Sequence, residues 1–132
     1  MPRRSEPLPP SCWARRARVL AGALAVAGSA WAQAPSAATQ QEIEQLFSAL
    51  QQSNCQFQRN GSWYDAAKAA DHLRQKYDYL RKRDLAPTTE LFIERAGTQS
   101  SASGKPYQVR CGNAAPVPSQ QWFGQQLKVL RR

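Results

Sequence analysis

A short polar segment, from Thr98 to Pro106, carries the side chains of this chain that are best suited to bind a ligand. It combines hydroxyl groups, a lysine and a glycine that permits positive φ, and backbone N–H groups in such loops can surround an anion. We therefore predict a binding site for a phosphate, a carboxylate or a sugar, with Arg59 or Arg110 nearby. The predicted site residues are Ser100, Ser101, Ser103, Gly104, Lys105 and Arg59. The alternative is that the hydroxyls and the glycine only build a turn into the next strand.

The same serines raise the question of nucleophilic catalysis, which needs a base within hydrogen-bond reach of the hydroxyl. His72 is the single histidine of the chain, so a hydrolase would pair it with Ser101 or Ser103. Neither serine lies in a Gly-x-Ser-x-Gly turn. A lone histidine in a helix is more often a hydrogen-bonding residue than a catalytic base. The sequence therefore favours a module without catalytic residues, and a small serine hydrolase is the alternative function.

The composition gives little indication of a metal site or a cofactor site. One histidine and three cysteines cannot supply a multi-histidine metal centre, and the chain contains no glycine-rich dinucleotide fingerprint. Glu90 and Glu94 are spaced like a pair of acids on one helix face, but a small domain offers them no deep cleft for glycoside hydrolysis. We predict neither a metal nor a cofactor.

Residues 1–32 have the pattern of a cleavable signal peptide. An arginine-rich start precedes a short apolar run, Val19 to Ala27, which is too short for a bilayer core of about 30 Å. Small residues at Ala30 and Ala32 then predict cleavage between Ala32 and Gln33. We expect a periplasmic protein without a membrane span, and an uncleaved membrane anchor is the alternative.

Cleavage would lower the net charge from +9 to +5, because five basic residues and one acidic residue leave with the segment. Binding to nucleic acid or another polyanion is therefore not expected, although basic residues gather near two predicted helix ends. Such charges also complement the helix dipole, by about 0.3–1 kcal/mol each. The residues that a polyanion site would use are Arg81, Lys82, Arg83, Arg131 and Arg132.

Cleavage would also remove Cys12 and leave two cysteines, Cys55 and Cys111. In an oxidising compartment, the simplest outcome for two cysteines is one intramolecular disulfide, which the chain-entropy model values at roughly 4 kcal/mol. A redox-active pair is the alternative. However, cysteines with that role usually lie two residues apart at a helix N-terminus.

The elements that must position these residues are predicted to be mainly helical. Apolar residues recur with a helical period of 3.6 after Thr39, which forms a capping box with Glu42, and again from Trp63 to Arg83, after a capping pattern of Ser62 and Asp65. A third, shorter helix is predicted from Thr88 to Ala96, with Thr88 or Thr89 as its cap and a strand as the alternative. Ser119 is expected to cap a final helix.

Strand signals are few. Tyr107 to Cys111 alternates with period two, and Cys55 to Phe57 does so over three residues, next to a turn at Asn60-Gly61. We therefore predict a mainly α fold, a small helical domain of three to four helices with a short extended pair and one disulfide. Residues 33–39 are predicted to be a flexible lead-in, and residues 40–132 a single domain.

Several stretches of the chain resemble the YfeK-like proteins, a family of small exported bacterial proteins that is known as a domain of unknown function. The residues that carry the resemblance are Ser53-Asn54-Cys55-Gln56-Phe57, Arg59-Asn60-Gly61, His72-Leu73, Lys76-Tyr77, Phe92-Ile93, the run from Ser100 to Cys111, and Trp122 with Leu127. The resemblance implies a periplasmic location and supports the bridge between Cys55 and Cys111. It implies no activity. We thus expect a small binding or accessory module whose partner is another envelope protein or a small anionic ligand.

Overall fold

The structure is a computed structural model that describes Gly22 and residues 33–132 of the chain. The predicted signal peptide, including Ala32 at the predicted cleavage site and apart from Gly22, lies outside the described residues. Within the described part, no helix is both long enough and apolar enough to cross a membrane.

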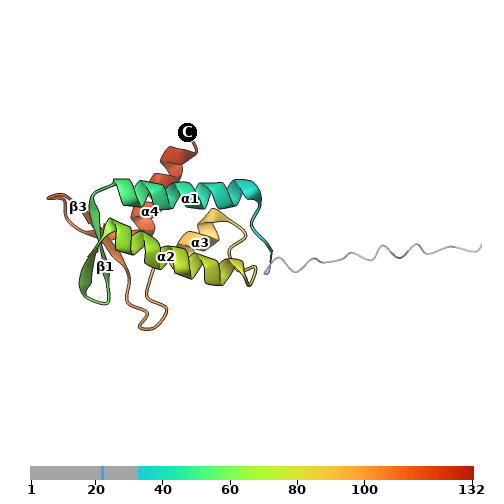
Figure 1. The fold of residues 1–132 in the computed structure, drawn as a ribbon, viewed down its shortest axis with the longest axis horizontal. Coiled ribbons are helices and arrows are strands. Elements are labelled where there is room, and N and C mark those ends of the chain that lie inside the picture. Colours follow the sequence, from blue (N-terminus) through green and yellow to red (C-terminus); the bar gives the residue numbers. More distant parts are fainter. Residues whose placement is uncertain (1–21, 23–32) are drawn as a thin grey trace, which may run out of the picture.

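The described residues form four helices and one four-stranded antiparallel sheet (Figure 1). In chain order the elements are α1 (Ala37–Gln52), β1 (Cys55–Arg59), β2 (Ser62–Asp65), α2 (Ala66–Arg81), α3 (Thr89–Ala96), β3 (Gln108–Cys111), β4 (Val117–Pro118) and α4 (Ser119–Leu130). The strand order across the sheet is β2-β1-β3-β4. The prediction of a mainly α domain with only a short extended pair is therefore wrong, and the domain is mixed α/β.

The second strand was missed because its residues also have the pattern of a helix start. Asn60 and Gly61 both have positive φ, 50° and 82°, as a two-residue hairpin turn requires. The chain after this turn pairs back on β1, with Ser62 opposite Arg59, so the helix predicted from Trp63 begins only at Ala66. The helix cap is Asp65, whose side chain accepts a hydrogen bond from the N–H of Lys68, 2.8 Å away.

Two other predicted helix caps are wrong as well. The first helix begins before Thr39, because Ser36 is its cap and accepts from the N–H of Thr39 at 3.1 Å. Helix α1 thus starts inside the segment predicted as a lead-in. Ser119 is buried in the first turn of α4, and its hydroxyl has no hydrogen-bond partner among the described residues. The predicted cap at Thr88 is confirmed, since its Oγ1 accepts from the N–H of Leu91 at 3.2 Å.

The helices and the inner face of the sheet enclose one hydrophobic core. Figure 1 shows α1 and α2 side by side, with the sheet at the end where both connect to the strands. At the centre of the helices, the rings of Phe47, Tyr77 and Phe92 pack edge to face or tilted, with centroids 5.4–6.2 Å apart. On the sheet, Phe57 contacts Tyr107, with ring centroids 4.9 Å apart. The core therefore holds α2 against both β1 and the residue that precedes β3.

The predicted disulfide between Cys55 and Cys111 is confirmed. The two cysteines lie directly opposite each other on β1 and β3, the central strands of the sheet, although they are 56 residues apart in the sequence. Cys55 is buried in the core. The bond therefore fastens the two strands at the end where α1 enters the sheet.

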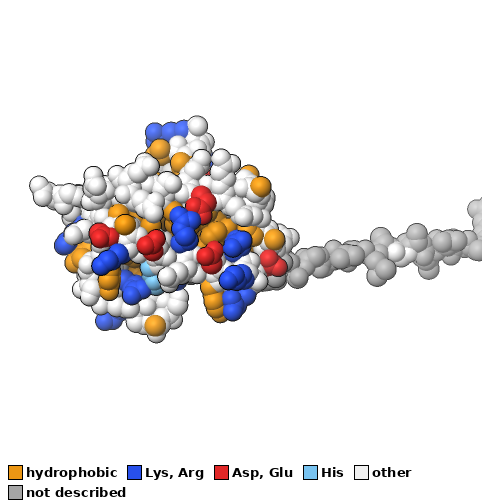
Figure 2. Space-filling model, in the orientation of Figure 1, with side chains coloured by type: hydrophobic (Ala, Val, Ile, Leu, Met, Phe, Trp, Pro, Cys, Tyr) orange, Lys and Arg blue, Asp and Glu red, His pale blue; other side chains and the backbone are white. Residues whose placement is uncertain are grey.

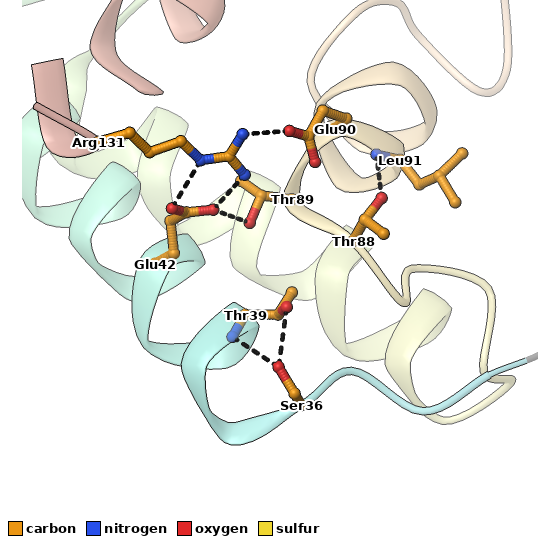
Figure 3. A network of polar contacts seen from close by, with 8 residues as sticks. All are labelled: Ser36, Thr39, Glu42, Thr88, Thr89, Glu90, Leu91 and Arg131. Atoms are coloured by element: carbon orange, nitrogen blue, oxygen red, sulfur yellow. Dashed lines mark hydrogen bonds and ion pairs between the residues drawn. The ribbon is translucent and has the colours of Figure 1, made fainter. Parts of the chain in front are cut away.

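A polar network joins α4 to α1 and α3 (Figure 3). The guanidinium of Arg131 donates to both carboxylate oxygens of Glu42, at 2.8 and 3.0 Å, and to Glu90. The buried hydroxyl of Thr89 also donates to Glu42, at 2.5 Å. Glu42 therefore pairs with a distant helix instead of capping its own.

We expect Glu42→Gln to lower the free energy of unfolding by about 1 kcal/mol at neutral pH. The hydrogen bond from Arg131 lowers the pKa of Glu42, against the opposing effect of burial. The stability that comes from this shift is present above pH 4.5, the ordinary value, and is lost as the pH falls through the lowered pKa. Urea unfolding should therefore show the variant and the wild type converging once the pH has fallen below the lowered pKa of Glu42.

The control is Glu94→Gln, an exposed carboxylate on α3 for which the described residues supply no hydrogen bond or ion pair. It should leave the unfolding free energy unchanged. Equal losses in the two variants would contradict a stabilising role for the Arg131 network.

Candidate functional site

Four side chains from three parts of the fold meet beside the middle of α2. His72 and Lys76 lie one turn apart on α2, Arg59 ends β1, and Tyr107 directly precedes β3. Figure 2 shows this face of the molecule, where the single histidine, in pale blue, lies beside Lys and Arg side chains. Tyr107 is buried, whereas the other three are partly exposed. We call these four residues the His72 cluster.

The hydrogen bonds of the cluster define the state of the imidazole. Arg59 Nη1 lies 2.7 Å from His72 Nδ1 and 3.1 Å from Nε2. A guanidinium only donates, so the nearer nitrogen, Nδ1, must accept, and the ring is neutral with its proton on Nε2. That nitrogen lies 3.3 Å from the hydroxyl of Tyr107. The histidine therefore receives a hydrogen bond from the arginine and donates one to the tyrosine.

Lys76 completes the cluster from the next turn of α2. Its ammonium donates to the hydroxyl of Tyr107 at 3.1 Å and to the carbonyl of Gln99 at 2.9 Å. It also lies 4.8 Å from the centre of the Tyr107 ring. The lysine is thereby held at the start of the polar loop that the sequence singled out.

Burial and neighbouring positive charges disfavour the protonated forms of Lys76 and His72. Burial, and then the charge of Arg59, lowers the pKa of Lys76 to about 8. The pKa of His72 is also lowered, first by burial and then by the charges of Arg59 and Lys76. No acidic side chain lines the three cavities around the cluster. The site is therefore short of negative charge, which a ligand can supply.

Three neighbouring cavities share His72 as a lining residue. One of about 340 Å³ extends over Arg59, Ser101 and Tyr107, and one of about 380 Å³ extends along α2 toward Leu80. A smaller cavity of about 180 Å³ lies between β1, β2 and α2. The cluster is thus accessible from several sides and offers room for a small molecule.

Only some residues of the predicted loop site lie at the cavity beside the His72 cluster. Ser100 and Ser101 line the 340 Å³ cavity together with Arg59. Ser103, Gly104 and Lys105 do not line it.

Hydrogen bonds within the loop occupy several of its donors. The hydroxyl of Ser103 donates to Asn60 Oδ1 at 2.5 Å, and the N–H of Gly104, whose φ is 72°, donates to the carbonyl of Ser100 at 2.9 Å. The N–H of Lys105 lies 3.3 Å from the hydroxyl of Ser103. Arg110 lies elsewhere, bonded to Gln56 Oε1 at 2.7 Å and stacked on Trp63. The available donors therefore come from the side chains of the cluster.

Sequence reasoning missed Lys76 and Tyr107 as site residues and considered His72 only as a base. The spacing of His72 and Lys76, four residues apart on one helix, was a usable signal, because such residues share a helix face. Nothing local pointed to Tyr107, since the packing of β3 beside α2 is what brings its hydroxyl to the lysine.

The cluster is not arranged as a serine hydrolase. Both ring nitrogens of His72 have partners other than a serine, namely Arg59 and Tyr107. Among the described residues, no hydrogen bond joins the imidazole to Ser101 or Ser103, although Ser101 lines two of the same cavities. The described residues also contain no group of three or more His, Cys, Asp or Glu side chains that could hold a metal ion.

The basic residues that were considered for a polyanion site are separated and partly neutralised. Arg131 is paired with Glu42 and Glu90, and Arg81 lies 3.4 Å from Asp78. Arg83 covers the exposed ring of Tyr79. Two of the five residues, Arg81 and Arg131, are therefore paired with carboxylates in the described structure.

Fold and site together define a small disulfide-bonded α/β domain with a cationic pocket beside one helix. Residues 37–131 match a family of unknown function, DUF5329, and the chain belongs to this family. The chain is also similar to the uncharacterized protein YfeK of Salmonella typhimurium strain LT2, with 37% identity over 79 residues. That match covers 59% of this chain and 63% of the relative, so the chain spans less than two thirds of the relative's length. No solved structure matches the chain.

These comparisons confirm the resemblance to the YfeK-like proteins. Neither the family description nor the name of the relative states an activity.

Proposed function

We propose that this protein is a periplasmic binding module that holds a small anion, a phosphate or a carboxylate, at the His72 cluster. The observation that carries the proposal is that Arg59 bonds to His72 while His72 and Lys76 converge on the hydroxyl of Tyr107, without a carboxylate in the cavity lining. Basic groups that are gathered and partly desolvated in this way repel one another, and an anion relieves the repulsion.

The donors of the cluster are suited to an oxyanion. The hydroxyl of Tyr107 accepts from Lys76 and His72, so its own proton is available to a ligand. The ammonium of Lys76 uses two of its three N–H groups on Tyr107 and Gln99, which leaves the third. The guanidinium of Arg59 contacts the imidazole through Nη1 only, and its fork can bind two oxygens of one anion.

The proposed location has separate support. A disulfide between buried central strands is typical of proteins that fold in an oxidising compartment such as the periplasm. The predicted signal peptide, 1–32, would deliver the chain there.

Titration of the purified protein with inorganic phosphate and with acetate tests the proposal. We expect Arg59→Gln to weaken binding of the preferred anion by about 10- to 100-fold, because hydrogen bonds to charged groups contribute about 1.5–3 kcal/mol. The matched control is Arg110→Gln, which removes an arginine of the adjacent strand that contacts Gln56 and Trp63 instead.

Two results would overturn the proposal. The first is a wild-type protein that binds neither anion with a Kd below about 10 mM. The second is an equal loss of affinity in Arg59→Gln and Arg110→Gln, which would reveal a general effect of positive charge.

A further inference from the structure

We propose that the ligand is an amphipathic anion whose charged group lies at the His72 cluster and whose apolar group covers Tyr79 and Leu80. This inference rests on the proposed function and adds the chemical class of the ligand. The structural basis is that the cavity of about 380 Å³ continues from the cluster along α2.

The two parts of the ligand site are contiguous. His72, Lys76 and Ser101 line both the 340 Å³ cavity over Tyr107 and the 380 Å³ cavity. An anion bound to the cluster through the first cavity would therefore lie at the entrance of the second.

The sequence of α2 arranges the polar and apolar groups in order. Lys76 follows His72 by four residues, and Tyr79 and Leu80 follow Lys76 by three and four residues, so they form one stripe on the helix. The helix rises about 5.4 Å per turn, and the change from basic to apolar side chains takes place within one turn after Lys76. A ligand that lies along this stripe would contact the basic side chains with one end and the apolar side chains with the other.

Tyr79 is an exposed aromatic residue in a fixed position. Its side chain is 56% exposed, the most of any large apolar residue in the described part of the chain. The guanidinium of Arg83 lies 3.6 Å from the centre of its ring and covers one face. Leu80, the next residue of α2, is partly buried and packs against the core. An exposed ring beside a leucine in a cavity wall is an apolar surface that a ligand can cover.

The size and charge of the cavity favour an organic anion. A volume of about 380 Å³ is within the range of pockets that hold small organic ligands and exceeds the need of a bare phosphate. Arg95 also lines this cavity, and its guanidinium donates to the carbonyl of Leu85 at 2.5 Å. Because Lys76 and Arg95 line the cavity and no acidic side chain does, the lining disfavours a cationic ligand, and its apolar side chains favour an anion with an apolar group.

The test compares three probes with one charged group: inorganic phosphate, phenyl phosphate and octyl phosphate. We expect phenyl phosphate, octyl phosphate or both to bind about tenfold more tightly than inorganic phosphate, because only they cover the apolar wall. Tyr79→Ser should remove most of this gain and leave the affinity for inorganic phosphate unchanged.

Val129→Ser is the matched control, because Val129 is similarly exposed, at 54%, and lies on α4 away from the three cavities. It should leave the preference for organic phosphates intact. If all three probes bind equally and all require Arg59, the amphipathic ligand is overturned and the proposed anion site stands. If the probes bind without a requirement for Arg59, or do not bind, the proposed function fails as well.

Discussion

Replacing Cys55 and Cys111 together with alanine should lower the free energy of unfolding by about 4 kcal/mol. The bond closes a loop between residues 56 apart, and the unfolded chain without it gains the corresponding conformational entropy. For a domain of about 100 residues, a loss of this size lowers the Tm by roughly 20 °C. Thermal unfolding followed by circular dichroism, with and without reductant, measures the effect.

The control for this prediction uses the chain that retains residues 1–32 and replaces its third cysteine, Cys12, which the predicted cleavage would remove and which lies outside the described residues. Cys12→Ala should leave the Tm and its sensitivity to reductant unchanged. A double Cys55/Cys111 variant that unfolds at the wild-type temperature would contradict the stabilising role of the disulfide.

The same bond should influence the binding site from a distance. Cys55 and Cys111 oppose each other at one end of the β1–β3 pair, and the register runs from there to Gln58 and Gln108. Arg59 and Tyr107 are the next residues beyond that last pair, about 13 Å from the disulfide at 3.3 Å per residue. Opening the disulfide should therefore loosen the strands that place these two donors, and weaken anion binding along with stability.

The affinity for phosphate should fall about tenfold per pH unit above pH 8. Burial and the charge of Arg59 lower the pKa of Lys76 to about 8, so the ammonium that binds the anion loses its proton above that pH. Phosphate keeps its charge in this range. Affinities measured by calorimetry between about pH 7 and pH 10 give the slope.

His72 and Tyr107 keep their charge states between pH 8 and 10. The lowered pKa of His72 leaves the imidazole neutral throughout, and burial raises the pKa of Tyr107 above 10. The change in affinity is therefore assigned to Lys76 alone.

The sign of the effect on stability is opposite to the effect on binding. For a lysine with a lowered pKa, the unfolded chain binds the proton more tightly than the folded one. The unliganded protein should thus gain stability as the pH rises from about 8 to the ordinary lysine value of 10.5. A bound anion reverses this trend because it stabilises the charged ammonium, and binding near pH 8 should take up a proton.

Lys76→Arg is the matched variant, since it retains the positive charge but removes the titration. It should bind phosphate with an affinity that stays constant from about pH 8 to pH 10, where phosphate keeps its charge. A flat profile in the wild type, or the same slope in Lys76→Arg, would contradict the role of Lys76 in the site.

The helical periods of the fold were predicted better than the helix caps. The buried face of α1, with Ile43, Leu46, Phe47 and Leu50, is the one that the 3.6-residue period indicated. The third helix has its predicted cap at Thr88. These features depend on residues three or four positions apart, so neighbouring side chains in the sequence specify them.

Sheet pairing was where prediction failed. Ser62 and Asp65 fit the pattern of a helix start, but they are the first and last residues of β2. This strand forms because it pairs with β1 across the Asn60-Gly61 turn. The two residues of β4 follow β3 through a turn that includes Pro116, and too few positions are involved for a period to be visible. The stability of a strand comes from contacts with its partner strand, so the sequence pattern of the strand alone does not predict the pairing.

The candidate site likewise contains residues that the sequence indicated and residues that only the fold brings together. Arg59 and Ser101 were selected by residue type, whereas Lys76 and Tyr107 joined them only because α2 packs against β1 and the start of β3. The pair of Cys55 and Cys111 was predicted from the cysteine count together with the signal pattern that would remove Cys12, and it is confirmed. What the tertiary structure decided is which charges share one cavity, since the strength of their interaction depends on distance and burial in space and not on separation along the chain.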